Sequence, residues 1–249
     1  MNGKDRCEVE RTNWIDVLKP YVDIPHVSGA YREDDWQNRH FSRLREMLIT
    51  YGDNMPKMRL WEHVRALMFL GNVNGKHILD IGTRESVIPA YLACQGATVT
   101  ACDLHPEAIV HRKNVTVEKA DARDLPFEDE SFDVVLSTAC LKHVPGWGDR
   151  TAIREMARVV KPHGLVAVSF DFGPDYRPTP SDISGRRIYD ADSVQSRLVS
   201  PSGLSLVGPE SWDVRWDAPK DTWPIKSQAK SIWDKDYNLQ VGFILLRKE

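Results

Sequence analysis

The middle of the chain alternates between short apolar runs and helical patterns. The runs read as strands are HILDI (77–81), ATVTACD (97–103), VTVEKADA (115–122), FDVVLST (132–138) and LVAVSFDF (165–172). Between them lie VIPAYLACQG, with Pro89 in its first turn and Gly96 at its end, a short helix from Pro106, and DRTAIREMARVVKPHG, which stops at Pro162 and Gly164. Strands that are apolar on both faces and alternate with helices predict a parallel sheet covered on both sides.

Residues 1–75 carry no strand signal but two amphipathic helical patterns. The first runs from Trp36 to Tyr51 and stops at Gly52, and the second runs from Leu60 to Met68 and stops at Gly71. Each pattern buries one face against something else. We therefore expect an N-terminal helical cap over 1–75, followed by an α/β domain over 76–249.

Residues 173–249 continue the α/β domain with two insertions, at 173–190 and 211–238. A Pro-rich loop comes first, then a short helix near 192–199, the strand-like LSLVG, a Trp-rich stretch and the strand VGFILLRKE. The tryptophans of that stretch predict either a lid that excludes water or a hydrophobic nucleus, and the pattern does not separate the two. They are Trp212, Trp216, Trp223 and Trp233.

Composition narrows the classes of function. The chain has 249 residues, 41% of them apolar, and a net charge of −3, so no global field draws it to nucleic acid or to an anionic membrane. No apolar run approaches the length of a transmembrane helix, and the N-terminus is charged, so we expect a cytoplasmic protein. The four cysteines have no CxxC pairing or metal spacing, which indicates reduced thiols and no metal site.

Acidic residues stand where the predicted strands end. In such sheets, ligands bind beyond the carboxyl ends of the strands. Gly82 follows the first strand, but Arg84 and Val87 break the dinucleotide loop pattern GxGxxG. Asp103 ends the second strand, where a carboxylate can accept hydrogen bonds from both ribose hydroxyls, and Asp121 ends the third, where it can accept from an adenine amino group. The pair favours a single adenosine over NAD; the alternative is that both are plain loop acids.

Three segments resemble the class I S-adenosylmethionine-dependent methyltransferases, and within them the type 11 small-molecule branch. They are HILDIGTRESVIPAYLACQGATVTACDL, VEKADARDLPFEDESFDVVLSTACLKHV and AIREMARVVKPHGLVAVS. The resemblance covers roughly residues 58–172. It implies a Rossmann-like, doubly wound sheet of seven strands with an antiparallel last strand, in which LSLVG is the sixth strand and VGFILLRKE the seventh.

The resemblance also implies a binding site for S-adenosyl-L-methionine. The methionine pocket, the ribose site, the adenine site and the wall facing the sulfonium methyl would be formed by Asp80, Gly82, Thr83, Arg84, Ser86, Asp103, Leu104, Asp121, Ala122, Ser137, Thr138 and Ala139. Two features depart from the family pattern. The loop keeps only the first of three glycines, and Arg84 and Glu85 place long charged side chains there. Arg84 would either pair with the cofactor's carboxylate or narrow the pocket.

Methyl transfer from a sulfonium is an in-line displacement, so the protein contributes alignment, exclusion of water and, where needed, a base. His143, just past the fourth strand, is the first candidate base; the alternative is that it packs in the cofactor wall. Asp171 is the second candidate, with a solvated loop acid as its alternative. Cys140 is expected to be a small buried residue rather than a nucleophile.

The acceptor pocket should be roofed by the N-terminal helices and the late insertions. Its candidate residues are Tyr31, Trp36, His40, Tyr176 and Arg177, with Arg32, Arg186 and Arg187 as further candidates. The arginines could bind a phosphate or carboxylate of the acceptor or lie in a solvated basic patch, and Trp36 could instead belong to the core. The sequence thus predicts a methyltransferase, monomeric or homodimeric, acting on oxygen or nitrogen of a small molecule such as a sugar, a nucleotide sugar or a secondary metabolite. The alternative functions are a catalytically silent binding module, an RNA methyltransferase and an NAD-dependent oxidoreductase.

Overall fold

A mixed sheet forms the centre of the computed structural model, which describes residues 28–30, 42, 44–46, 57–84, 86–109, 114–178, 186–212 and 240–249. Its main strands lie in the order β4-β3-β2-β5-β6-β10. They are β2 (His77–Ile81), β3 (Thr98–Asp103), β4 (Val115–Lys119), β5 (Phe132–Thr138), β6 (Val160–Phe172) and β10 (Gln240–Arg247). β2 to β6 are parallel, whereas β10 runs antiparallel to β6, with Phe243 opposite Ser169. The predicted doubly wound sheet with an antiparallel last strand is confirmed.

Short strands extend the sheet beyond β10. β8 (Ser205–Leu206) pairs with it antiparallel, so the predicted sixth and seventh strands are neighbours. β1 (Ser28–Ala30) also pairs with β10, and β9 (Glu210–Ser211) pairs with β1. The expectation of no strand within 1–75 is therefore wrong. β1 is held by main-chain pairing of a Ser-Gly-Ala run, which has neither the apolar character nor the alternation that marks a strand in sequence.

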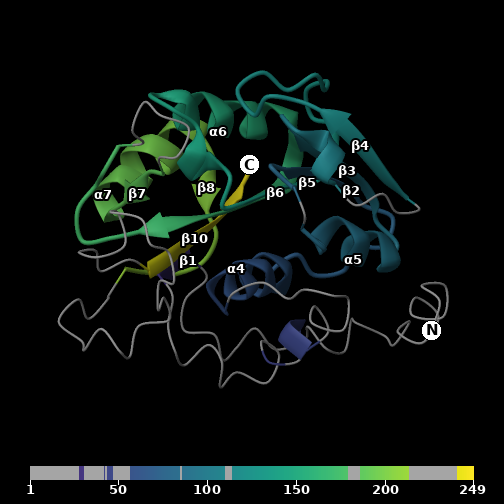
Figure 1. Cartoon of the computed structure of the whole chain (residues 1–249), viewed down its shortest axis with the longest axis horizontal. Helices are drawn as coiled ribbons and strands as arrows, with labels where there is room; N and C mark the ends of the chain where they lie inside the picture. Colours follow the sequence, from purple (N-terminus) through teal and green to yellow (C-terminus); the bar gives the residue numbers. More distant parts are fainter. Residues whose placement is uncertain are drawn as a thin grey trace.

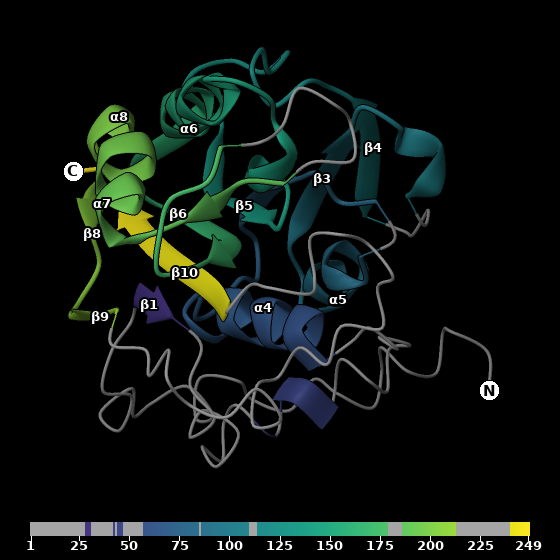
Figure 2. The same cartoon turned by 60° about the vertical axis from the view of Figure 1, so that its left-hand side comes forward.

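Helices cover both faces of the sheet (Figures 1 and 2). One face carries α6 (Gly148–Val159) and a continuous helical run made of α7 (Ala191–Val194), a π-helical turn, η5 (Gln195–Val199), and α8 (Ser200–Ser202). The other carries α4 (Lys57–Met68) and α5 (Ile88–Cys94). Successive side chains of β5 point to opposite faces of the sheet and so contribute to both cores. Val135 packs on the α6 side, and Val134 and Leu136 pack on the α4 side.

The junction between α6 and β6 differs from the expectation. The helix ends at Val159 and the strand begins at Val160, before Pro162. Phe132 pairs with Val160 but Val134 pairs with Leu165, so 161–164 bulges out of the ladder. The bulge places His163 at φ +62°, and an added Cβ on Gly164 would lie 2.9 Å from the Asp133 carbonyl oxygen. Proline and glycine here shape a bulge inside a strand rather than a loop between elements.

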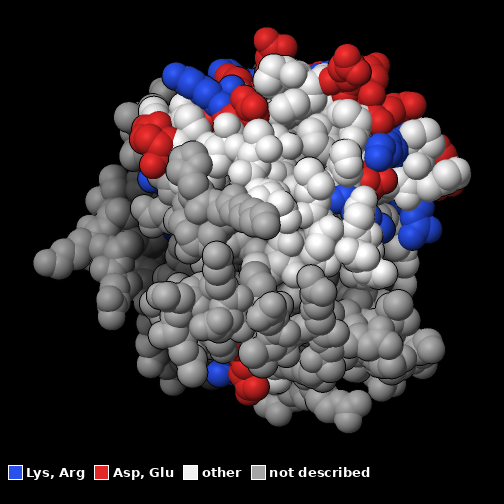
Figure 3. All heavy atoms as spheres, turned by 90° about the vertical axis from the view of Figure 1, so that its right-hand side faces the viewer, with Lys and Arg blue, Asp and Glu red and all other residues white. Residues whose placement is uncertain are grey.

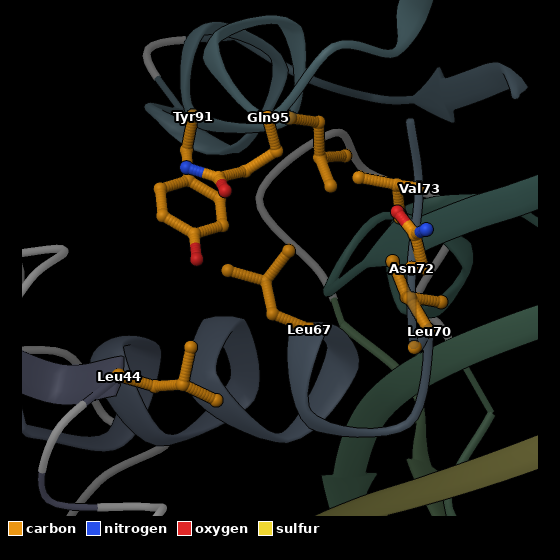
Figure 4. Close-up of a pocket in the computed structure, with 9 residues that line it drawn as sticks. Leu44, Leu67, Leu70, Asn72, Val73, Tyr91 and Gln95 are labelled. Atoms are coloured by element: carbon orange, nitrogen blue, oxygen red, sulfur yellow. The ribbon is translucent and has the colours of Figure 1, made fainter. Parts of the chain in front are cut away.

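The second N-terminal helical pattern is confirmed as α4, which packs on β5, β6 and β10. The first is described only at Ser42 and residues 44–46, which are helical. There Leu44 faces Leu67 and Tyr91 across an apolar cavity of about 60 Å³ (Figure 4). This packing joins the N-terminal segment to the core of the α4 face. The division into a cap and a domain stays a prediction.

Acidic and basic side chains are mixed on the described surface. On the face at the β4 end of the sheet, acidic side chains gather along the upper rim, and basic ones lie singly or in small groups among them (Figure 3). Within the described parts of the chain, no helix combines the length and apolar character needed to cross a membrane.

Cys102 and Cys140 are free thiols, but Cys94 is disulfide-bonded, so the expectation of four reduced cysteines is wrong for Cys94.

Candidate active site

The floor of the candidate site is a buried carboxyl group at the end of β2. Asp80 has no exposed surface, and the Thr83 hydroxyl lies 2.9 Å from its carbonyl oxygen and 3.0 Å from its Oδ2. Its Oδ1 is buried without a hydrogen-bond partner. Burial raises the pKa of Asp80 to about 7; the Thr83 hydrogen bond opposes this, and the nearby charge of Asp103 adds to it. An acid so placed suits a cationic partner for its free oxygen.

The loop after β2 turns sharply at Gly82. This residue has φ +73°, and its N–H donates to the Cys102 carbonyl at 2.8 Å, which ties the loop to the end of β3. The loop then leads into α5, where Ser86 Oγ accepts from the Ile88 N–H at 3.2 Å. Arg84 is exposed, with φ +44°, so its side chain lies toward solvent and is not buried in the pocket. Glu85 lies outside the described residues.

Asp103 and Leu104 stand at the tip of β3. Asp103 is half-buried, and its Oδ1 accepts from the His105 N–H at 2.9 Å, which fixes the carboxylate at the start of the turn. Leu104 is 51% exposed, one of the two large apolar side chains exposed among the described residues. An apolar surface beside a fixed carboxylate is suited to a nucleoside, since the carboxylate can accept from sugar hydroxyls while the base lies on carbon.

Asp121, just past β4, is already engaged by Arg123. The guanidinium donates to both carboxylate oxygens, the shortest contact being 2.6 Å from Nη2 to Oδ2, and these hydrogen bonds hold the pKa of Asp121 below its usual value. Sequence reasoning missed this pair. The carboxylate is therefore ionised and oriented, with lone pairs left over for a further donor. Ala122, the other predicted adenine contact, is buried beside it.

The wall after β5 is tightly packed. Ser137 is fully buried and Thr138 nearly so, while Ala139 takes φ +55° and its N–H donates to the Ser169 carbonyl and hydroxyl. Cys140 packs against Gly82, and burial raises the pKa of its thiol to about 12. Cys140 is half-buried, and a thiol that stays protonated is a poor nucleophile, in line with the expected packing role. His143 ends the short 3₁₀ turn η4 (Leu141–His143) and is exposed.

The second base candidate, Asp171 in β6, is buried in an ion pair. Its Oδ1 lies 2.6 Å from Lys142 Nζ, and its Oδ2 lies 3.3 Å from Arg186 Nε. To take a substrate proton, Asp171 would have to give up two cationic partners in a buried setting. The alternative of a solvated loop acid is wrong, because Asp171 is only 5% exposed. The pair ties β6 to the segment that carries His143.

A second buried ionic cluster lies at the start of α6. Asp149 accepts from Arg197 Nε and Nη2 at 2.8 and 2.7 Å and from the Tyr189 hydroxyl at 2.9 Å, and it lies 3.2 Å from Arg187 Nη1. Arg187 is completely buried, so neither an anion grip nor a solvated basic patch describes it. Sequence reasoning missed this cluster, since an isolated charged residue gives no signal of burial.

The candidate acceptor residues are described in part. Tyr176 lines a surface pocket of about 360 Å³ with Trp147, Arg150, Asp190, Asp192, Ser193, Ser196 and Arg197. Arg177 pairs through its main chain with Ile188. Trp212 packs on Phe170 and Phe172, as expected of a hydrophobic nucleus. Tyr31, Arg32, Trp36, His40, Trp216, Trp223 and Trp233 lie outside the described residues.

Comparison of the sequence with known proteins identifies methyltransferase relatives. The type 11 family model described as "Methyltransferase domain" matches residues 79–168. A probable S-adenosylmethionine-dependent methyltransferase of Mycobacterium tuberculosis is 31% identical over 190 residues, which is 71% of this chain and 68% of the relative. A demethylmenaquinone methyltransferase of Corynebacterium efficiens is 36% identical over 128 residues, which is 51% of this chain and 53% of that protein.

Solved structures agree on the fold. A 1,6-didemethyltoxoflavin-N1-methyltransferase of Burkholderia thailandensis, crystallised with its substrate and S-adenosylhomocysteine, superposes with a TM-score of 0.58 at 17% identity, covering 88% of this chain and 91% of that one. A methyltransferase of Mesorhizobium loti gives a TM-score of 0.53 at 19% identity over 77% of this chain and 99% of that one. The chain belongs to the S-adenosylmethionine-dependent methyltransferases, in their type 11 branch.

Proposed function

We propose that this methyltransferase moves the methyl group of S-adenosyl-L-methionine to an oxygen or nitrogen atom of a small molecule. The observation that carries the proposal is the pair of acids at the ends of the neighbouring parallel strands β2 and β3. There the buried Asp80, with its unpaired Oδ1, stands beside the fixed carboxylate of Asp103. The two groups suit the two polar ends of the same cofactor.

The described residues fit that cofactor. Oδ1 of Asp80 would accept from the ammonium of the methionine moiety, which would satisfy a buried oxygen that has no protein partner. Asp103 would accept from the ribose hydroxyls, Leu104 would cover the adenine, and Asp121, ionised and held by Arg123, would accept from its amino group. Arg84 is exposed, which leaves the glycine-poor loop compatible with binding.

When bound, the cofactor supplies an activated methyl group. The protein then has to align the acceptor with the carbon–sulfur bond and to keep water out. Ser137, Thr138 and Ala139 form the packed wall on that side, and the hydrogen bonds from Ala139 to Ser169 fix its main chain. His143, exposed at the rim, is the group that could accept the acceptor's proton, since Asp171 is engaged by Lys142.

Two observations support a small acceptor over RNA. The net charge is −3, and the described part of the face in Figure 3 mixes acidic and basic side chains without a continuous basic surface. The match to demethylmenaquinone methyltransferases covers about half of each chain, so it supports the shared methyl transfer rather than a quinone acceptor.

Calorimetry with S-adenosylhomocysteine tests the cofactor assignment. We expect a micromolar dissociation constant for the wild type, and no detectable binding would favour the silent binding module instead. Transfer is tested with S-adenosylmethionine labelled in the methyl group, incubated with fractionated cell metabolites and, separately, with total RNA. Label in a small metabolite supports the proposal, whereas label only in RNA would contradict it.

The same assays distinguish the two roles considered for His143, as the base or as part of the cofactor wall. If it is the base, His143→Ala lowers label transfer by roughly 10²-fold or more and leaves the affinity for S-adenosylhomocysteine nearly unchanged. A fall in affinity with normal transfer would assign His143 to the cofactor wall.

A further inference from the structure

Arg187 makes several of the hydrogen bonds that hold the segment carrying His143, in addition to the Lys142–Asp171 pair and a hydrogen bond from Arg197 Nη2 to the Gly146 carbonyl at 3.0 Å. This segment joins β5 to α6 and contains only the 3₁₀ turn η4 as regular structure. Arg187 donates from Nη1 to the Leu141 carbonyl at 3.2 Å, and from Nη2 to the carbonyls of Val144 at 3.0 Å and Gly146 at 2.7 Å. Its main-chain N–H donates to the Lys142 carbonyl at 2.7 Å. Arg187 therefore binds main-chain oxygens on both sides of His143.

Arg187, which we call the clamp of the segment 141–146, is itself held in place by buried contacts. Arg187 has no exposed surface, and its charge is balanced by Asp149 in the first turn of α6. Asp149 is held in turn by Arg197 from the turn η5 and by Tyr189 from β7 (Ile188–Tyr189). A guanidinium suits this position because its planar fork donates from separate nitrogens to carbonyl oxygens in different places, whereas an ammonium donates from one nitrogen.

The clamped segment also contacts the proposed cofactor site. Cys140, at its start, packs on Gly82 of the loop after β2. Val144 packs against Gly148 at the start of α6, and the aliphatic part of Arg123, which orients Asp121, lies against the same glycine. A shift of the segment would therefore change the packing on the side facing the methyl group and beside the adenine.

We propose that Arg187 is a positioning residue for methyl transfer, which sets the main chain of 141–146 so that His143 faces the transfer site. This inference rests on the proposed function. Arg187 acts through the peptide carbonyls and does not itself touch the cofactor or the acceptor. A displacement of a reacting group by about 1 Å can cost on the order of 10²-fold in rate, so a clamp of this kind matters to turnover more than to binding.

The test compares Arg187→Lys with a matched control, Arg158→Lys. Lysine keeps the charge beside Asp149 but donates from a single nitrogen, which cannot take the places of both Nη1 and Nη2. Arg158 offers a similar set of contacts at the other end of α6, because it donates to the carbonyls of Phe127 and Leu125 and pairs with Glu155. Both variants lose the same chemical group, so both should lower the melting temperature.

Hydrogen exchange, binding and transfer then separate the two variants. In Arg187→Lys the amides of His143 and Val144, which donate to Cys140 and Leu141, should exchange roughly tenfold faster or more, and in Arg158→Lys they should not. Label transfer to cell metabolites should fall by roughly tenfold or more in Arg187→Lys, while the affinity for S-adenosylhomocysteine stays within about threefold. Arg158→Lys should keep both within about threefold of the wild type.

The proposal is overturned if the two variants show the same exchange at His143 and Val144, or if label transfer falls only in proportion to stability in both. Exchange is measured without an acceptor, so it decides whether the clamp exists even where no metabolite is labelled. Failure of the proposed function looks different, because the wild type itself would then bind no S-adenosylhomocysteine.

Discussion

Gly82 and Cys140 approach each other so closely that no side chain fits between them. A Cβ built on Gly82 would overlap the Sγ and Cβ of Cys140, closer than real Cβ atoms approach other atoms. The two residues belong to the loops after β2 and β5, which flank the proposed cofactor site. This contact explains why the loop keeps a glycine at this position even though Arg84 and Ser86 stand at the next alternate positions, where other loops have glycine.

Gly82→Ala should therefore destabilise the protein for two reasons. Alanine is strained at φ +73°, and its methyl group would displace Cys140. We expect a loss of about 2–4 kcal/mol in the free energy of unfolding, measured by urea denaturation. Gly203→Ala is the control, because Gly203 has φ +67° but nothing within 4 Å of an added Cβ. Equal losses in the two variants would show that the Cys140 contact carries no weight.

Asp80 should make the stability of the free protein depend on pH. The pKa of about 7 in the folded state lies above the value of 3.8 for an ordinary aspartate, so between these pH values the folded state holds a proton that the unfolded state has released. Stability from this group is then present at low pH and is lost as the pH rises to about 7, by about 4 kcal/mol in all. Asp80→Asn removes the titration, so its stability relative to the wild type should rise from pH 4 to pH 7.5.

The same titration should govern cofactor affinity. If ionised Asp80 receives the cofactor's ammonium, S-adenosylhomocysteine should bind roughly tenfold more weakly at pH 6 than at pH 8. Asp80→Asn should bind weakly at both values and lose the pH dependence. Calorimetry across this range measures both effects. A wild-type affinity that is flat between pH 6 and pH 8 would place the ammonium away from Asp80.

Much of the fold follows from the sequence because it depends on local patterns. Buried runs such as FDVVLST and the helix after Ile88 stand out by periodicity, and the structure places them within a few residues of the predicted bounds. β1 could not be predicted, since three small residues become a strand only by pairing with β10. The bulge at 161–164 arises from a register shift between β5 and β6, which local pattern does not record.

The sequence likewise identifies some residues of the candidate site and not others. Asp80 and Asp103 could be identified because the carboxyl ends of parallel strands meet at one edge of a sheet. Arg187 and Asp149 could not be identified as partners, since 38 positions of sequence separate them and their burial depends on the tertiary structure. For the same reason Asp171 looked like an open base, although Lys142 neutralises it.

Asp103→Ala should weaken cofactor binding without unfolding the protein. The carboxylate is half-buried and, among the described contacts, accepts from the His105 N–H, so the loss in stability should be small. Removing a charged acceptor of two ribose hydrogen bonds should cost on the order of 1.5–3 kcal/mol of binding free energy, measured with S-adenosylhomocysteine. Glu128→Ala, which removes an exposed acid before β5, serves as the control. An unchanged affinity in Asp103→Ala would mean that the ribose lies elsewhere.

Asp149→Asn should destabilise the protein far more than the loss of a surface acid. The side chain is fully buried and faces Arg187 and Arg197, so a neutral amide would leave two buried guanidinium groups without their counter-charge. Breaking a buried pair in this way costs about 3–5 kcal/mol, whereas exposed pairs contribute about 0–1 kcal/mol. Asp133→Asn is the matched comparison, because its partner Lys161 is 37% exposed. Urea denaturation of both variants measures the difference; similar small losses would show that water reaches the α6 cluster and screens its charges.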